Sequence, residues 1–244
     1  MKIYVGTSGY GHKEWKGIFY PEKISPKAML GFYGEHLGAV EINYTFYHMP
    51  TQGILFDWAS QVPADFSFAL KASQVITHRK RLRQVEEEIK YFFSTLAALE
   101  QKMGPVLFQF PPSFHANRAA LAAFLPLLPA KRKCAFEFRH PSWDTPEILD
   151  LLREHGCSLV MADTEENPVG ELISTASWGY LRLRRGNYSP AELEQWLTRI
   201  KAQPWESAFV FFKHEEEAQE AKGPELAMYF QQLAGAAAPS RQPQ

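Results

Sequence analysis

Charged side chains recur at the carboxyl ends of short apolar segments along the sequence. Three are acidic and four are basic: Glu41, Glu137, Asp163, Lys71, Arg139, Arg182 and Arg184, with Lys213 a candidate fifth cation. A charge buried without a partner is costly, so charges gathered at one place need mutual pairing, water or a ligand. The excess of cations favours an anionic or carboxylated ligand.

Two of these carboxylates could divide the roles of a catalytic acid and base. Glu41 and Glu137 are the candidates, because carboxylates in unlike electrostatic surroundings acquire different pKa values. His78 and His140 also follow apolar segments and are candidates for a proton shuttle. A purely structural ion pair between Glu137 and Arg139 is the alternative for those two residues.

Aromatic and polar side chains are concentrated in the segments that follow the apolar runs, such as residues 8–17 and 44–50. Aromatic rings beside polar groups form the walls of many carbohydrate- and ring-binding pockets. The same rings can instead pack as a core that holds a long loop in place. The candidate ligand-binding residues are Tyr10, Trp15, Asn43, Tyr47, Lys71, Gln109, Arg139, Trp143, Asp163 and Arg182.

Histidines near these carboxylates keep a metal site open as an alternative. Imidazole and carboxylate together suit zinc or manganese. The histidines concerned are His12, His48, His78, His140 and His214. The sequence has no HExxH or CxxC spacing. No metal ligand and no cofactor is therefore assigned, and a divalent metal stays an alternative.

The elements that must position these residues alternate between two kinds. Short runs rich in Val, Ile, Leu and Phe predict strands at Lys2–Thr7, Ala39–Asn43, Phe66–Lys71, Pro105–Phe110, Cys134–Arg139, Ser158–Asp163, Gly179–Arg184 and Ala208–Lys213. The clearest predicted helices are Arg83–Lys102, Ala119–Leu128, Pro146–His155 and Pro190–Lys201. Ser189 before Pro190, with Glu192 following, is typical of a helix start.

Side chains alternate between the two faces of a strand. In the predicted strand at Cys134–Arg139, Phe136 and Phe138 share one face, whereas Glu137 and Arg139 share the other. The strands around Glu41, Lys71, Gln109 and Arg182 repeat this pattern. One face suits packing on helices, and the other is small at its start and polar at its end, as expected at the carboxyl-terminal mouth of a barrel.

About eight strands alternating with helices predict an α/β fold with parallel strands. The expected architecture is a (β/α)8 TIM barrel in one domain over residues 1–234, followed by a disordered tail at 235–244. An open doubly wound sheet is the alternative. The Gly6-Thr7-Ser8-Gly9 turn lacks dinucleotide-binding spacing, which weakens that alternative.

The charge balance and cysteine content indicate which classes of binding partner and which cellular location to expect. The formal net charge is -1, from 26 basic and 27 acidic residues, so nucleic acid and anionic membranes are not favoured. The basic run His78–Arg83, expected to open a helix, is typical of a solvated face, with binding to nucleic-acid phosphates as the alternative. Only Cys134 and Cys157 are present, and the start of the chain has no signal-like apolar segment, so a cytoplasmic location is expected. The oligomeric state is left open.

The sequence resembles the DUF72 (YecE-like) family. The resemblance is carried by five motifs: Val5-Gly6-Thr7-Ser8-Gly9-Tyr10 with Trp15 and Phe19-Tyr20-Pro21, Val40-Glu41-Ile42-Asn43 with Thr45-Phe46-Tyr47 and Pro50, Phe68-Ala69-Leu70-Lys71 with Ile76-Thr77-His78, Gly104–Pro112, and Glu137-Phe138-Arg139-His140 with Ser142-Trp143. It implies a TIM barrel and leaves the reaction undefined. The last third departs from the pattern: Leu183-Arg184-Arg185-Gly186 stands where many members resemble Leu-His-Gly, and Lys213-His214-Glu215 stands where many resemble Asn-Asn-Asp.

Three functions are open at this point. The first is an enzyme, such as a hydrolase or isomerase, that acts on a small anionic or sugar-like molecule by acid–base chemistry without a redox cofactor. The second is a metal-dependent hydrolase or isomerase. The third is a protein that binds a ligand or nucleic acid without catalysis.

Overall fold

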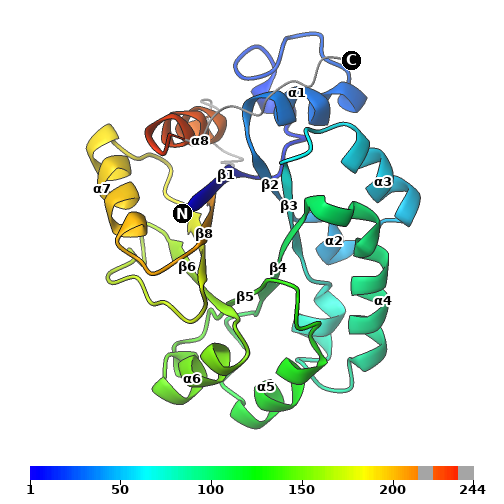
Figure 1. The fold of residues 1–244 in the computed structure, drawn as a ribbon, viewed down its shortest axis with the longest axis vertical. Coiled ribbons are helices and arrows are strands. Elements are labelled where there is room, and N and C mark those ends of the chain that lie inside the picture. The colour runs from blue at the N-terminus through cyan, green and yellow to red at the C-terminus, as the bar shows by residue number, and fades with distance from the viewer. Residues whose placement is uncertain (214–221, 236–244) are drawn as a thin grey trace.

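Eight parallel strands form a closed barrel in the order β1 to β8, with helices around its outside (Figure 1). The computed structural model describes residues 1–213 and 222–235. The strands are β1 (Lys2–Ser8), β2 (Ala39–Ile42), β3 (Ser67–Lys71), β4 (Met103–Gln109), β5 (Cys134–Glu137), β6 (Ser158–Asp163), β7 (Trp178–Leu183) and β8 (Ser207–Phe212). The predicted (β/α)8 barrel is confirmed, and an open sheet is excluded because β1 pairs with β8.

The α-helices are α1 (Met29–His36), α2 (Tyr44–Tyr47), α3 (Gln52–Ser60), α4 (Glu86–Leu96), α5 (Arg118–Phe124), α6 (Pro146–Glu154), α7 (Pro190–Lys201) and α8 (Lys222–Leu233). The bounds of α7 are those predicted, because a complete capping box fixes its start: Ser189 accepts from the Glu192 amide, and Glu192 accepts from the Ser189 amide. No comparably clear sequence signal marks α1, α2, α3 or α8.

Two predicted helices are shorter than expected. The segment predicted at Arg83–Lys102 becomes helical only at Glu86, and a 3₁₀ turn (Ala97–Lys102) follows α4. The segment predicted at Ala119–Leu128 is α5 followed by a 3₁₀ turn at Leu125–Leu127. Pro126 lies in that turn, and a proline lacks the amide hydrogen that would continue an α-helix.

The two faces of the strands divide as the alternation predicts. A small interior cluster contains Ala39, Ala69, Leu107, Ala135, Tyr180 and Phe211 among others. The alternate side chains, such as Val40, Phe68, Phe108, Phe136 and Leu181, belong to a larger outer cluster shared with the helices. Polar residues such as Glu41 and Arg182 follow further along the strands on the interior face, where both are buried.

Nothing in the described residues suggests a membrane span, since no helix there is both long and apolar enough to cross a bilayer. Gly235 ends a turn after α8, and the rest of the predicted tail, 236–244, lies outside the described residues. His214, one of the histidines considered for a metal, lies outside them too.

Candidate functional site

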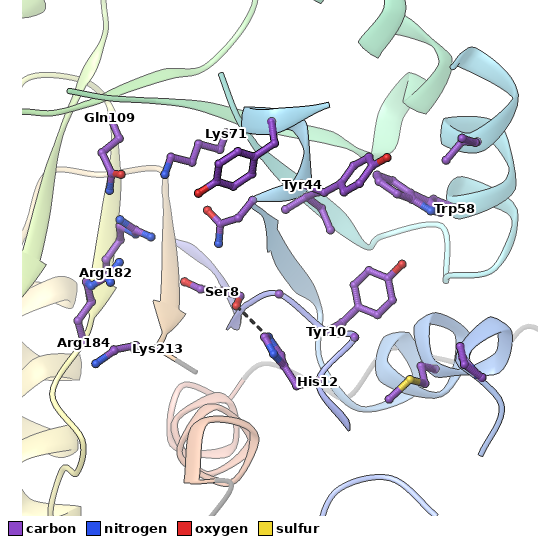
Figure 2. Close-up of a pocket in the computed structure, with 18 of the residues that line it drawn as sticks. Ser8, Tyr10, His12, Tyr44, Trp58, Lys71, Gln109, Arg182, Arg184 and Lys213 are labelled. Atoms are coloured by element: carbon purple, nitrogen blue, oxygen red, sulfur yellow. Dashed lines mark hydrogen bonds between the residues drawn. The ribbon is translucent and has the colours of Figure 1, made fainter. Parts of the chain in front are cut away.

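A cavity of about 1120 Å³ opens where the strands end (Figure 2). Its lining comes from β1, β2, β3, β4 and β7 or the segments directly after them, from Arg139 beyond β5 and Lys213 beyond β8, and from α1 to α3. The lining residues are Ser8, Gly9, Tyr10, Gly11, His12, Pro26, Met29, Ile42, Asn43, Tyr44, Tyr47, Ile54, Trp58, Lys71, Gln109, Arg139, Arg182, Arg184 and Lys213. Active sites of α/β barrels occupy this end of the barrel.

Arg182 on β7 bridges two carboxylates across the barrel interior. Its Nη1 donates to Glu137 Oε2 at 2.6 Å, and its Nη2 donates to Glu41 Oε1 at 2.8 Å. The Arg182 residue is only 2% exposed, and both glutamates are buried. A planar guanidinium can serve two carboxylates at once, which a lysine ammonium cannot do with fixed geometry.

Further side chains donate to these carboxylates from other parts of the barrel mouth. Glu41 also accepts from Ser8 Oγ at 2.9 Å and from Tyr180 Oη at 2.7 Å. Ser8 and Glu41 are register partners between β1 and β2, and Tyr180 lies two residues before Arg182 on the same face of β7. Strand register therefore places Ser8 beside Glu41, whereas Tyr180 reaches Glu41 from β7, which does not pair with β2.

Glu137 is held in the same manner. It accepts from Gln109 Nε2 at 2.9 Å and from Arg139 Nε at 3.2 Å. Gln109 and Glu137 are register partners between β4 and β5. The predicted pairing of Glu137 with Arg139 is therefore present, within a larger network that also includes Arg182.

Both glutamates are held in the ionised form. Burial raises the pKa of Glu41, but Arg182 and the hydroxyl donors outweigh burial and lower that pKa overall. Burial likewise opposes ionisation of Glu137, but Arg182, Arg139 and Gln109 lower its pKa to about 2. Two carboxylates that both stay ionised at neutral pH compensate Arg182, and neither has the raised pKa that a general acid needs.

Lys71 is a lining residue whose pKa is lowered toward neutrality. It is the last residue of β3 and is half-buried, with its Nζ 4.1 Å from the centre of the Phe46 ring. The pKa of Lys71 is lowered to about 8, mainly because the side chain is buried and next because Arg182 is positively charged. Glu41 and Glu137 act in the opposite direction but do not cancel these effects.

The lining carries five cations: Lys71, Arg139, Arg182, Arg184 and Lys213. None of its described members is acidic. The two carboxylates that reach this network, Glu41 and Glu137, offset only part of the charge. Burial and the nearby Arg182 also lower the pKa of Arg184, which is a sign of mutual repulsion between the cations.

Of the other predicted ligand residues, Tyr10, Asn43, Tyr47 and Gln109 line the cavity with the cations. The structure does not bring Trp15 or Trp143 there. Trp15 is fully buried against Phe19 and Tyr20, in the core of its own loop. Trp143 donates from Nε1 to the Phe114 carbonyl at 2.7 Å and stacks on Phe138 with ring centres 4.5 Å apart.

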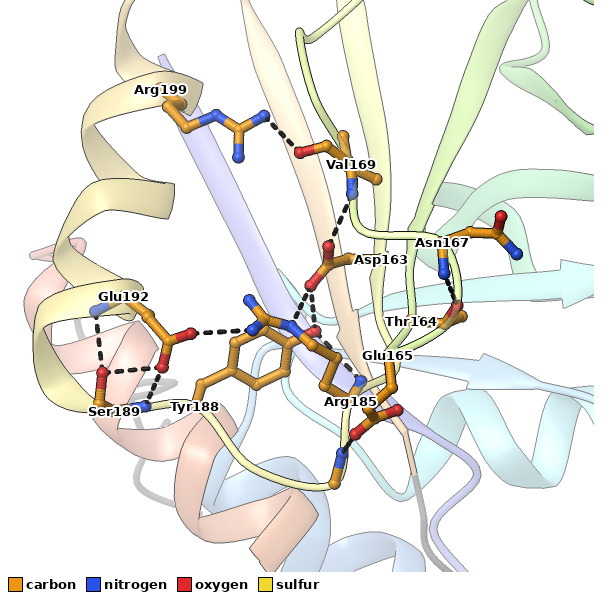
Figure 3. A network of polar contacts seen from close by, with 11 residues as sticks. Asp163, Thr164, Glu165, Asn167, Val169, Arg185, Tyr188, Ser189, Glu192 and Arg199 are labelled. Atoms are coloured by element: carbon orange, nitrogen blue, oxygen red, sulfur yellow. Dashed lines mark hydrogen bonds and ion pairs between the residues drawn. The ribbon is translucent and has the colours of Figure 1, made fainter.

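Asp163 lies on the outer face of β6 and not at the cavity. Met161, two residues earlier, packs in the outer cluster, so strand alternation directs Asp163 outward as well. Its carboxylate accepts from Arg185 Nε at 2.7 Å, Tyr188 Oη at 2.8 Å and the Val169 amide at 2.8 Å (Figure 3). Asp163 therefore fixes the loops after β6 and β7.

The two predicted proton shuttles also lie away from the lining. His78 contacts the edge of Phe46, with ring centres 4.8 Å apart, and its Nδ1 is 2.9 Å from Thr77 Oγ1. Burial and the positive charge of Lys71 lower the pKa of His78, which favours the neutral imidazole. The Nδ1 of His140 is hydrogen-bonded to Ser142 Oγ, and its ring is tilted against that of His115 with ring centres 3.7 Å apart.

Several lining or network residues were absent from the predicted ligand set. Tyr180 shares strand parity with Arg182, which is a signal that could have identified it. Arg184 and Lys213 were expected in the cationic group and do line the cavity. Tyr44 lies in the aromatic segment 44–50 that follows β2, where only Tyr47 was predicted to bind a ligand, whereas Trp58 lies on α3, which does not directly follow a strand.

Within residues 1–213 and 222–235, no group of three or more His, Cys, Asp or Glu side chains is arranged to hold a metal ion. Cys134 and Cys157 are both buried at the amino-terminal ends of β5 and β6, and burial raises the pKa of each thiol. They have the character of core residues and not of nucleophiles.

Comparison with known proteins shows the family. The UPF0759 protein YecE of Escherichia coli K12 is 29% identical over 144 residues, which is 58% of this chain and 50% of YecE. The UPF0759 protein YunF of Bacillus subtilis strain 168 is 30% identical over 184 residues, which is 69% of this chain and 62% of YunF. The chain thus matches less than two thirds of the length of either relative.

Solved structures match over nearly the whole chain. A DUF72 family protein of Thermotoga maritima MSB8 has a TM-score of 0.83 at 27% identity, covering 96% of this chain and 100% of the other. A glycoside hydrolase family 5 enzyme of Prevotella bryantii B14 has a TM-score of 0.51 at 12% identity, covering 95% of each chain, and shares the fold alone. The model of the DUF72 family, described as a protein of unknown function, matches residues 4–244, and the chain therefore belongs to that family.

Proposed function

We propose that the protein is an enzyme that binds a small phosphate or carboxylate compound at the mouth of the barrel and moves a proton on it. The observation that supports this is the lining of the cavity, with five cations and no acidic side chain among its described members. An anion there would relieve repulsion between the cations and would receive several charge-assisted hydrogen bonds.

Lys71 is the group that would exchange the proton. A catalytic base works best when its pKa is near the operating pH, and the pKa of Lys71 is lowered to about 8. In its neutral form, the amine would accept a proton from the substrate and become an ammonium ion. Arg139 and Arg184, which line the same cavity, would stabilise the negative charge left on the substrate.

In this proposal Glu41 and Glu137 are positioning residues. They hold the Arg182 guanidinium in one orientation, and they stay ionised while Lys71 titrates. This differs from the assignment of the two glutamates as an acid–base pair, which would require one of them to have a raised pKa.

Proton exchange with solvent tests the proposal, because any reaction that begins with removal of a C–H proton can exchange that proton for deuterium. The purified protein is incubated in D2O with small phosphorylated and carboxylated compounds, and C–H exchange or conversion is followed by NMR. We expect at least one compound to exchange or convert, and the Lys71→Met variant to lose this activity by about 100-fold or more. Lys90→Met, at an exposed position on α4, is the matched control.

Isothermal titration with inorganic phosphate and sulfate separates catalysis from binding. Binding by the wild-type protein that is weakened in Arg184→Met, without exchange of any compound, would favour a binding protein over an enzyme. Failure of the wild-type protein to bind either anion would overturn the proposal.

A further inference from the structure

The cavity has two chemically different halves. The cations come from the ends of β3, β5, β7 and β8, whereas the segments after β1 and β2 supply mostly aromatic and apolar side chains. Figure 2 shows Arg182, Arg184 and Gln109 on one side, and Trp58 and Tyr10 on the other. The cavity, at about 1120 Å³, is far larger than a single phosphate group requires.

The aromatic half presents ring surfaces to the cavity. Tyr44 and Tyr47 on α2 are 52% and 64% exposed although they line it. Trp58 on α3 is half-buried and also lines the cavity. Large rings left open at a cavity are suited to stacking on a planar ring of a ligand.

Tyr10 is held in place for such a contact. Its carbonyl accepts a hydrogen bond from Tyr20 Oη at 2.6 Å, and its ring lies against Tyr33 with centres 6.3 Å apart. Trp15 and Tyr20 form the packed core beneath this loop. The Tyr10 segment is therefore anchored before any ligand arrives, which lowers the entropy cost of binding.

Neutral polar groups complete the lining. Asn43 follows β2 directly and lines the cavity, and its side chain does not cap α2. An amide in this position can bond to hydroxyl groups. The lining thus offers cations, a neutral amide and aromatic rings, which match a phosphate, a sugar and a base respectively.

We propose that the ligand of the cavity is a nucleoside monophosphate, an inference that rests on the proposed function and names its substrate class. The phosphate lies among Lys71, Arg139, Arg184 and Lys213. The ring stacks in the half formed by Tyr10, Tyr44 and Trp58. A free mononucleotide fits the balanced net charge of the chain better than a long nucleic acid does.

Isothermal titration with four probes tests this class: adenosine monophosphate, ribose 5-phosphate, adenosine and inorganic phosphate. Because base–aromatic stacking typically contributes enough energy for about a tenfold change in affinity, adenosine monophosphate is expected to bind about tenfold more tightly than ribose 5-phosphate. Adenosine, which lacks the anion, is expected to bind more weakly than adenosine monophosphate.

Variants on α3 separate stacking from folding. Trp58→Ala is expected to weaken adenosine monophosphate about tenfold while leaving ribose 5-phosphate and inorganic phosphate nearly unchanged. Trp58→Phe keeps a ring and should retain most of the affinity. Phe56→Ala is the matched control, since Phe56 is on the same helix and 67% exposed but does not line the cavity.

The outcomes distinguish the two proposals. Equal affinities for adenosine monophosphate and ribose 5-phosphate, with inorganic phosphate still bound, would overturn the nucleotide class and leave the anion site standing. A loss of phosphate affinity in Trp58→Ala equal to the loss for the nucleotide would also overturn it. A short single-stranded oligonucleotide binding more tightly than any mononucleotide would replace the free ligand by a nucleic acid. Absence of binding by every probe would remove the proposed function as well.

Discussion

At the scale of single residues, Arg182 determines the character of the site. Arg182 is almost fully buried and forms ion pairs with both Glu41 and Glu137. Among the described residues, no other cation that pairs with these two carboxylates is as deeply buried. Each partner compensates the other, so loss of one leaves uncompensated charge in the barrel interior. Strand alternation predicted that Arg182, Glu41 and Glu137 share the interior. Their joint bridge could not be predicted, because it depends on how three non-adjacent strands meet across the barrel.

Removal of Arg182 measures the strength of this network. Arg182→Met leaves Glu41 and Glu137 buried without their shared cation, and we expect a loss of about 3–5 kcal/mol in the free energy of unfolding. Urea denaturation followed by circular dichroism gives this value. Addition of Glu41→Gln and Glu137→Gln should recover part of the loss. Arg153→Met, which breaks an exposed pair with Asp150, should change stability by less than about 1 kcal/mol. A change in the free energy of unfolding for Arg182→Met as small as that for Arg153→Met would contradict a stabilising role of Arg182 between the two glutamates.

The pH dependence of anion binding tests Lys71. Its pKa of about 8 means that the ammonium form is lost as pH rises through 8, while a bound anion favours that form. Sulfate affinity should therefore fall above pH 8, with proton uptake on binding. Titration of sulfate from pH 6.5 to 9.5 in buffers of different ionisation enthalpy measures both. Lys71→Arg should keep the affinity nearly constant over this range, and a pH-dependent affinity in that variant would assign the effect elsewhere.

At the scale of elements, strand ends proved easier to predict than the loops beyond them. All eight strands begin and end within two residues of their predicted bounds, because β-branched and aromatic runs mark strands strongly. Trp15 and Trp143 were expected at the ligand but pack inside their loops, since a large ring in a long connection gains more by burial there. The prediction for Asp163 was wrong for another reason: the strand had the correct bounds, but Asp163 shares its parity with the outward-facing Met161.

The outward position of Asp163 leads to a prediction about the loops after β6 and β7. Asp163→Ala removes the acceptor of three hydrogen bonds, one of them from Arg185, and we expect a loss of about 2 kcal/mol or more in the free energy of unfolding. Chemical denaturation measures it. Asp150→Ala, at an exposed position of α6, is the control and should change stability by less than about 1 kcal/mol. An equal effect of the two variants would show that the Asp163 network contributes little.

At the scale of the whole molecule, one polar network joins strands that do not pair with one another. Arg182 on β7 connects to Glu41 on β2 and to Glu137 on β5, and Ser8 and Gln109 extend the network to β1 and β4. The closed barrel was predictable from the alternation of strands and helices. The contribution of α3 to the cavity, through Ile54 and Trp58, was not predictable, because the position of α3 follows from packing and not from strand parity.

This network makes the free energy of unfolding of the barrel depend on pH in the acid range. The pKa of Glu137 is about 2 in the folded protein, and that of Glu41 is also lowered, so the unfolded chain binds more protons below about pH 4.5. Stability from these groups is complete above that pH and is lost as pH falls toward 2. The free energy of unfolding in urea at pH 6, 5, 4 and 3 should therefore decrease toward the acid end.

Glu137→Gln removes one titrating group and should flatten the decrease, whereas Glu147→Gln, at an exposed position of α6, should flatten it less, because an exposed carboxylate contributes less. An identical slope in the wild-type protein and in Glu137→Gln would show that the barrel interior does not control its acid stability.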